Sequence, residues 1–190
     1  MNPNDRWAVG AVVLTFALAS GCSRDHAGSA DAPASKLPPP SVPDNLKAGD
    51  GEIVTAKLAA KGAQIYECQV GDNGAYAWKL VGPDAELTDD TGKHVGTHYA
   101  GPTWESVDGS KVVAEVKAKA DAPAGPGSVP WLLLKAKSTS GTGTFGKVTS
   151  VQRVDTAGGT PSVGGCDVQH LGAQQRADYK ATYYFYSPRG

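Results

Sequence analysis

Apolar and polar residues alternate with a period of two along much of this chain, in short runs that end at glycine, proline, asparagine or aspartate. In the run from Asp178 to Tyr186, for example, Tyr179, Tyr183 and Phe185 fall on one face, and lysine and threonine fall on the other. A surface helix would instead repeat its apolar positions every three or four residues. The pattern therefore predicts strands rather than helices.

We expect about nine short strands joined by turns. They cover residues 52–58, 63–70, 75–81, 94–99, 103–107, 111–120, 129–134, 145–155 and 178–186. The lysine-rich run 111–120 is typical of an edge strand, the unbroken apolar run 129–134 indicates a strand buried on both faces, and only 171–177 favours a helical turn. The predicted fold is all-β, an antiparallel β-sandwich or barrel with long loops, in one domain over residues 43–188.

The N-terminal segment has the pattern of an export signal. Trp7 to Ala19 is an unbroken apolar run, too short for a membrane-spanning helix, which needs about 20 residues. Small residues then precede Cys22, as in the bacterial lipobox, although Leu18 stands one position further from the cysteine than is usual. We expect a lipoprotein signal peptide over residues 1–21 and lipidation, including palmitate, on Cys22; an ordinary signal peptide cleaved nearby is the alternative.

Residues 22–42 are rich in alanine, serine and proline and nearly free of large apolar side chains. Such a segment cannot bury enough surface to order itself, so we expect a disordered tether. Ser23 rather than aspartate follows Cys22, which by resemblance to known lipoproteins favours the outer membrane. The predicted location is the cell envelope, with the domain lipid-anchored in the outer membrane and facing the periplasm.

Charge and motif spacing exclude several functions. The net charge of −1 gives no basic surface for nucleic acid. Gly141 to Lys147 resembles a nucleotide-binding loop, but a predicted strand follows it where that motif requires a helix, so no cofactor is expected. His94 and His98 would lie about 13 Å apart on a strand, too far to share one metal ion, and no metal site is predicted.

Cys68 and Cys166 are the two cysteines that remain besides Cys22. In an exported chain the oxidising surroundings favour a disulfide between them. A reactive thiol pair is the alternative, but the two residues lack the close spacing of redox sites. We predict a structural disulfide that joins an early strand to the loop before the last strand.

Gly96 to Val113 concentrates side chains that can carry chemistry in a short span, which is interrupted by two turn signals. Two interpretations stay open: a strand corner whose tryptophan fills the core, or one wall of a binding site. The polar run 152–155 is the expected opposing wall, with an ion pair from Arg153 to Glu105 or Asp155. The candidate binding residues are His98, Trp104, Glu105, Asp108, Gln152, Arg153 and Asp155.

The chain resembles the family of exported bacterial and fungal proteins called domain of unknown function 3455. The matching segments are 62–68, Trp78, 98–105, 108–110, 130–134, 152–156 and 183–186, in order over roughly 42–187. The family tends to have asparagine where Asp155 stands. The resemblance implies the domain limits and supports the cysteine pair, and it implies no substrate.

The sequence thus leaves three functions open. The first is a lipid-anchored envelope protein that binds a small molecule or glycan, with the membrane as its partner. The second is a hydrolase or lyase in which His98 works with Glu105 or Asp108. The third is an interaction module without a pocket. A buried pocket lined by His98, Trp104 and Arg153 would favour the first two.

Overall fold

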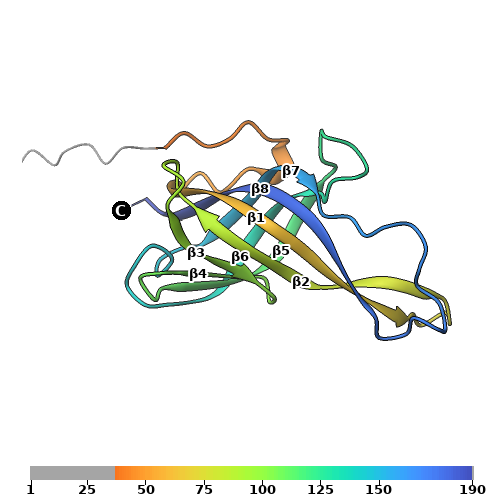
Figure 1. Cartoon of the computed structure of the whole chain (residues 1–190). Coiled ribbons are helices and arrows are strands. Elements are labelled where there is room, and N and C mark those ends of the chain that lie inside the picture. The colour runs from red at the N-terminus through yellow and green to blue at the C-terminus, as the bar shows by residue number, and fades with distance from the viewer. Residues whose placement is uncertain (1–36, 190) are drawn as a thin grey trace, which may run out of the picture. The chain divides into compact units, whose positions relative to one another are not determined.

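The computed structural model describes residues 37–189. They form a closed barrel in which eight antiparallel strands follow one another around the wall in chain order, and β8 pairs back to β1 (Figure 1). The elements are η1 (Asp44–Leu46), β1 (Glu52–Val70), β2 (Tyr76–Thr88), β3 (His94–Tyr99), β4 (Thr103–Ser106), β5 (Lys111–Ala120), β6 (Trp131–Ser140), β7 (Ser150–Gly158) and β8 (Gln174–Pro188). The predicted all-β antiparallel fold is confirmed, and of its two forms the structure is the barrel.

The predicted signal peptide, Cys22 and most of the predicted tether lie outside the described residues. Within residues 37–189, no helix is long and apolar enough to cross a membrane.

Two predicted turns are wrong, because small residues there serve close packing instead of chain reversal. Residues 59–62 continue a single strand, β1, of 19 residues. A Cβ atom on Gly62 would lie 2.2 Å from the carbonyl oxygen of Asp84, so glycine allows β2 to approach closely. Residues 82–84 likewise lie inside β2, where Pro83 is tolerated because β3 pairs with β2 only from Ala85 onward.

Two further predictions at the C-terminal half are corrected. Residues 145–149 belong to the connection that precedes β7, and Phe145 is fully buried in the core against Phe185, with 4.5 Å between ring centroids. The predicted helical turn over 171–177 is absent, since β8 begins at Gln174. The backbone of Cys68 binds the carbonyl of Ala173, which extends β-type pairing to this segment.

The predicted alternation in β8 is confirmed, with Tyr179, Tyr183 and Phe185 buried on the inner face. The apolar run of β6 is buried on both faces as expected. Its Leu132 and Leu134 join the interior core, while Leu133 is buried on the other face, and η1 packs against β5 and β6. The barrel therefore has a packed interior and an N-terminal segment that covers part of its outer wall.

The β3–β4 hairpin is shorter than the strands on either side of it. It has strands of 6 and 4 residues, whereas β2 has 13 and β5 has 10. β4 pairs with β5 only at Lys111 to Val113. The prediction of an edge strand over 111–120 is therefore wrong for residues 111–113, and it fits residues 114–120. Beyond the hairpin tip at Gly101 and Pro102, no strand within residues 37–189 fills the wall between β2 and β5.

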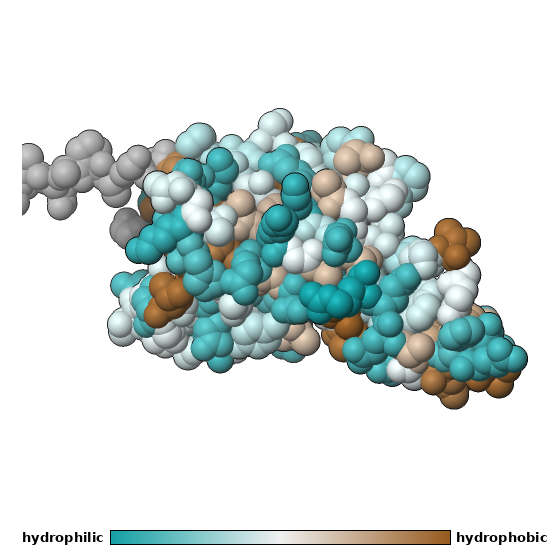
Figure 2. Space-filling view, viewed as in Figure 1, coloured by the Kyte–Doolittle hydropathy of each residue, from teal (hydrophilic) through white to brown (hydrophobic). Residues whose placement is uncertain are grey.

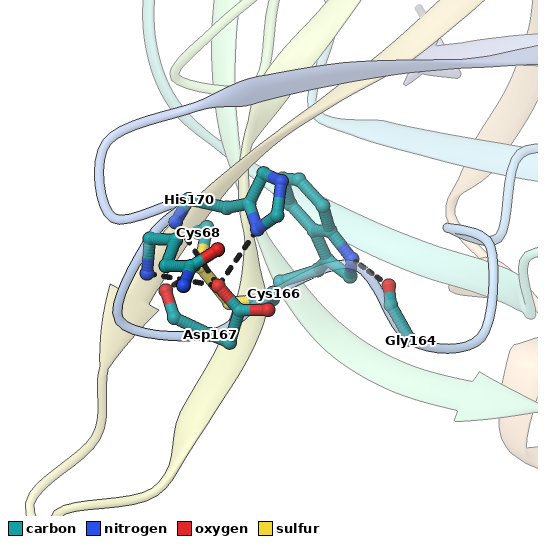
Figure 3. A network of polar contacts seen from close by, with 7 residues as sticks. Cys68, Gly164, Cys166, Asp167 and His170 are labelled. Carbon is teal, nitrogen blue, oxygen red and sulfur yellow. Dashed lines mark hydrogen bonds and ion pairs between the residues drawn. A yellow bond between two sulfur atoms is a disulfide. The ribbon is translucent and has the colours of Figure 1, made fainter.

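The N-terminal part of β2, which does not pair with β3, continues with β1 and β8 into an arm that leaves the barrel (Figure 1). The predicted disulfide between Cys68 and Cys166 is present and ties the loop before β8 to β1 (Figure 3). Trp78 supports this loop by donating its indole N–H to the carbonyl of Gly164 at 2.8 Å. Figure 2 shows apolar residues gathered toward the end of this arm. The exposed apolar side chains there include Val70, Val163, Val168 and Leu171.

We predict that the disulfide contributes strongly to stability, because it joins residues 98 positions apart. By the loop-entropy model, its loss lowers the free energy of unfolding by up to about 4–5 kcal/mol. Urea unfolding of the Cys68→Ser/Cys166→Ser variant beside the oxidised wild type measures this difference. The matched control is the wild type under reducing conditions, which should approach the variant. Equal unfolding midpoints for all three samples would contradict the prediction.

Candidate functional site

A cavity of about 320 Å³ lies inside the barrel and opens through the gap above the β3–β4 hairpin. Its inner wall combines aliphatic residues of β6 with polar and aromatic side chains from five other strands. These inner residues are Gln64, His98, Trp104, Leu132, Leu134, Arg153 and Tyr183. Its volume lies within the range of small-molecule sites, and an eight-stranded barrel has room for one small ligand.

The rim of the opening is apolar. Leu80 and Val81 of β2 lie on one side and Val116 of β5 on the other, with the Gly101–Pro102 turn between them. Leu80, Val81 and Val116 are 55, 47 and 53% exposed, respectively. Exposed large apolar side chains that gather around an opening are typical of a ligand-binding groove.

His98 and Trp104 face each other across the β3–β4 pair and both point inward. Their rings stack with centroids 4.3 Å apart. The Nδ1–H of His98 donates to the carbonyl of Thr103 at 2.8 Å, which leaves Nε2 as the unprotonated nitrogen. Burial lowers the pKa of His98 to about 3, the bond to Thr103 opposes this shift, and the charge of Arg153 adds to it. The imidazole is therefore neutral at physiological pH.

Arg153 brings a positive charge into the barrel and is only 8% exposed. Its Nε and Nη2 donate to the carbonyl of Pro130 at 3.2 and 2.9 Å. No carboxylate among residues 37–189 lies within ion-pair distance of it. A buried charge without a counter-charge is costly, so this guanidinium is the electrostatic feature that most needs an explanation.

Neutral polar groups surround this charge. The hydroxyl groups of Tyr179 and Tyr183 lie 3.4 Å apart. Burial raises the pKa of the Tyr183 phenol, and Arg153 beside it only partly opposes that shift. The phenol therefore stays protonated, and neither it nor the neutral imidazole of His98 offers Arg153 a negative charge. The side-chain nitrogen of Gln64 lacks a hydrogen-bond partner of ordinary geometry, although the Tyr179 phenol lies near its amide.

Glu105 and Asp108, the two acids predicted to work with His98, lie elsewhere. Glu105 is on the outer face of β4, where it accepts a hydrogen bond from Tyr99 at 2.6 Å and forms an ion pair with Lys111 at 3.0 Å. The predicted ion pair between Arg153 and Glu105 is therefore wrong, because successive residues of a strand point to opposite faces and Trp104 takes the inner one.

Asp108 organises the closed end of the barrel. Its carboxylate accepts hydrogen bonds from the backbone and hydroxyl groups of Ser110 and Thr144, which lower its pKa. Ser110 in turn accepts the backbone N–H of Phe145, the residue that fills the core at this end. Asp108 thus connects the β4–β5 turn to the β6–β7 connection and takes no part in the cavity.

Gln152 and Asp155 also leave the cavity, although they neighbour Arg153 in β7. Gln152 is buried on the outer wall, where it donates to the carbonyl of Leu46 in η1 and accepts from Tyr186, each at 2.5 Å. Asp155 is exposed at an irregularity of β7 and has a positive φ of 50°. The predicted pairing of Arg153 with Asp155 is therefore not formed.

Of the seven predicted residues, the structure brings His98, Trp104 and Arg153 to one cavity and places the other four outside it. The prediction missed Gln64, Tyr183 and the apolar rim. Gln64 carried a usable signal, since it shares the inward parity of Tyr66 and Cys68 and is the polar member of that face. The apolar rim had no such signal in the sequence, because its position depends on where the β3–β4 hairpin ends.

The fold and cavity define a class: a small antiparallel β-barrel with a mainly apolar interior pocket and a buried arginine that has no acidic partner within residues 37–189. The family model described as protein of unknown function DUF3455 matches residues 49–187, and the chain belongs to this family. This confirms the resemblance seen in the sequence. Comparison with curated proteins and with solved structures finds no match.

We predict that burial of neutral His98 makes the fold sensitive to mild acid. The pKa is about 3 in the folded state, whereas the ordinary value of an exposed histidine is 6.5, so the unfolded state binds more protons between these values. Stability is therefore lost as the pH falls below 6.5, by about 1 kcal/mol per pH unit. Urea unfolding at several pH values measures this slope.

His98→Phe keeps an aromatic ring on Trp104 but cannot titrate, so its slope above about pH 4.5 should flatten. The control His94→Gln, an exposed position on the same strand, should keep the loss. Identical slopes for wild type and His98→Phe would refute the assignment.

Proposed function

We propose that this protein is a cell-envelope binding protein that holds one small, mainly apolar molecule inside its barrel. The observation that carries the proposal is the cavity of about 320 Å³, which is reached through an apolar opening. Burying apolar ligand surface there would contribute about 25 cal/mol per Å² before the costs of association. The missing wall between β2 and β5 provides a route of entry without unfolding of the barrel.

The geometry favours binding over catalysis. The hydrolase or lyase expected from the sequence would use His98 together with Glu105 or Asp108. Here the Nδ1–H is held by a backbone carbonyl, and Glu105 and Asp108 are engaged elsewhere. The cavity also favours a binding role over that of an interaction module without a pocket.

An apolar molecule suits the cavity better than a glycan. Sugar sites present open aromatic faces together with several polar groups, whereas one face of Trp104 is covered by His98 and the edges of Tyr183 and Phe185 pack against it. Tyr179 and Tyr183 are themselves fully buried in the core.

We further propose that Cys22 carries lipid and holds the domain at the outer membrane, facing the periplasm. The support is the sequence pattern of apolar run, small residues and cysteine. More than one acyl chain gives stable anchoring. A tether over residues 22–42 would then keep the barrel near the membrane, where apolar molecules concentrate.

The binding proposal predicts saturable uptake of a neutral apolar probe. N-phenyl-1-naphthylamine, whose fluorescence rises in apolar surroundings, should bind with one site per chain. Val116→Trp narrows the opening with a bulky ring and should weaken binding at least about tenfold, or about 1.4 kcal/mol. Fluorescence titration of the purified protein measures both affinities.

The matched control is Val107→Trp, which adds the same ring at an exposed valine, 66% accessible, that does not line the cavity. It should bind the probe within about twofold of wild type. The proposal is refuted if the wild type shows no saturable binding, or if the two tryptophan variants bind the probe equally well.

The anchoring proposal predicts that Cys22→Ala releases the protein from membranes into the soluble periplasm. Fractionation of the exporting host measures the distribution, and mass spectrometry of the mature wild-type protein should find an acylated N-terminal cysteine. The control Cys68→Ser should remain with the membrane. A mature N-terminus at another residue, without lipid mass, would rule the anchor out.

A further inference from the structure

The unmet polar groups of the cavity are all hydrogen-bond donors. The side-chain nitrogens of Gln64 and Trp104 are buried and have no acceptor among the described residues. Arg153 donates from Nε and Nη2 to a single carbonyl, and the Tyr183 hydroxyl is the other polar group beside its guanidinium. Because an unsatisfied buried donor destabilises a protein, a cavity with several of them is suited to a ligand that brings acceptors.

The free edge of Arg153 specifies the kind of acceptor. The side edge of the guanidinium, formed by Nε and Nη2, is held by Pro130, which fixes the orientation of the group. The end edge, formed by Nη1 and the second hydrogen of Nη2, is a planar fork. Such a fork matches the two oxygens of a carboxylate and binds them with two parallel hydrogen bonds.

Charge leads to the same ligand class. His98, Tyr179 and Tyr183 surround Arg153 as neutral groups, so the inner end of the cavity carries one positive charge. The path from this end to the surface passes Leu132, Leu134 and the apolar rim. A molecule that fits both regions has one anionic end and an apolar body.

We propose that the cavity binds an amphipathic monocarboxylate, with its carboxylate on the free edge of Arg153 and its apolar body directed toward the rim of β2 and β5. Gln64 and Tyr183 line the same inner wall, and their amide and hydroxyl groups would supply further donors to the carboxylate oxygens. This inference rests on the proposed binding function and names its ligand class. It also accounts for a buried cation that has no acidic partner within residues 37–189.

The test compares two molecules that differ only in their head group. Octanoate and octan-1-ol compete with N-phenyl-1-naphthylamine for the purified protein at neutral pH, where the acid is ionised. In the wild type, octanoate should displace the probe at a concentration at least about tenfold lower than octan-1-ol. Equal displacement by the two molecules, or a preference for the alcohol, would overturn the proposal even without any variant.

Arg153→Met removes the charge and keeps an extended apolar side chain. We expect octanoate and octan-1-ol to displace the probe from this variant at equal concentrations, each measured against the variant's own affinity for the probe. Arg153→Lys keeps the charge without the fork and should retain only part of the preference. The matched control Arg176→Met removes an exposed arginine that pairs with Asp84 outside the cavity, and its preference should equal that of wild type.

The outcomes separate the two proposals. If the probe binds and Val116→Trp blocks it, but octanoate has no advantage, the binding function stands and the carboxylate assignment falls. If the advantage survives in Arg153→Met, the carboxylate binds elsewhere and the assignment to Arg153 is wrong. If the probe does not bind the wild type at all, both proposals fail.

Discussion

The structure depends on the pairing of its first strand with its last. β1 runs antiparallel to β8 from Glu52 to Glu67, and this ladder joins the two ends of the sheet into a closed wall. Without it, β1 and β8 would both present open edges with unpaired backbone groups. Closure also gives every strand an inner face, so the inward residues of all strands meet in one core. The cavity exists because that core is incomplete where the β3–β4 hairpin ends early.

The closed wall places a few polar residues where they cannot reach water easily. Arg153 enters the interior because its parity in β7 is that of Val151, which is fully buried. The same parity rule sends Gln152 to the outer wall, where Leu46 and Tyr186 satisfy it. Two adjacent polar residues therefore lie in opposite surroundings: Gln152 is hydrogen-bonded through both ends of its amide on the outer wall, and Arg153 donates to one backbone carbonyl at the cavity. This contrast is the physical basis of the proposed site.

The two ends of the molecule are stabilised in different ways. At one end Asp108 and Ser110 hold the β6–β7 connection, and Phe145 fills the core behind it. At the other, the arm of β1, β2 and β8 has little interior of its own, and the Cys68–Cys166 disulfide holds its loop in place. The cavity lies inside the barrel, and its rim residues Leu80 and Val81 belong to β2, the strand that continues into the arm.

By itself the sequence determined the fold class, most strand positions, the disulfide and the family, because these follow from local alternation, turn residues and cysteine count. The inward-facing positions of Tyr179 and Tyr183 in β8 could be read from the sequence for the same reason. The tertiary structure alone decided that Gly62 and residues 82–84 continue strands, since only the close approach of β1 and β2 shows why small residues stand there. It also decided the site: Glu105 and Arg153 both looked available for pairing, but the closed barrel puts the wall of the sheet between them. Strand parity is a local property that a sequence displays, whereas the end of a hairpin and the partner of a buried charge are set by distant segments that meet only when the barrel closes.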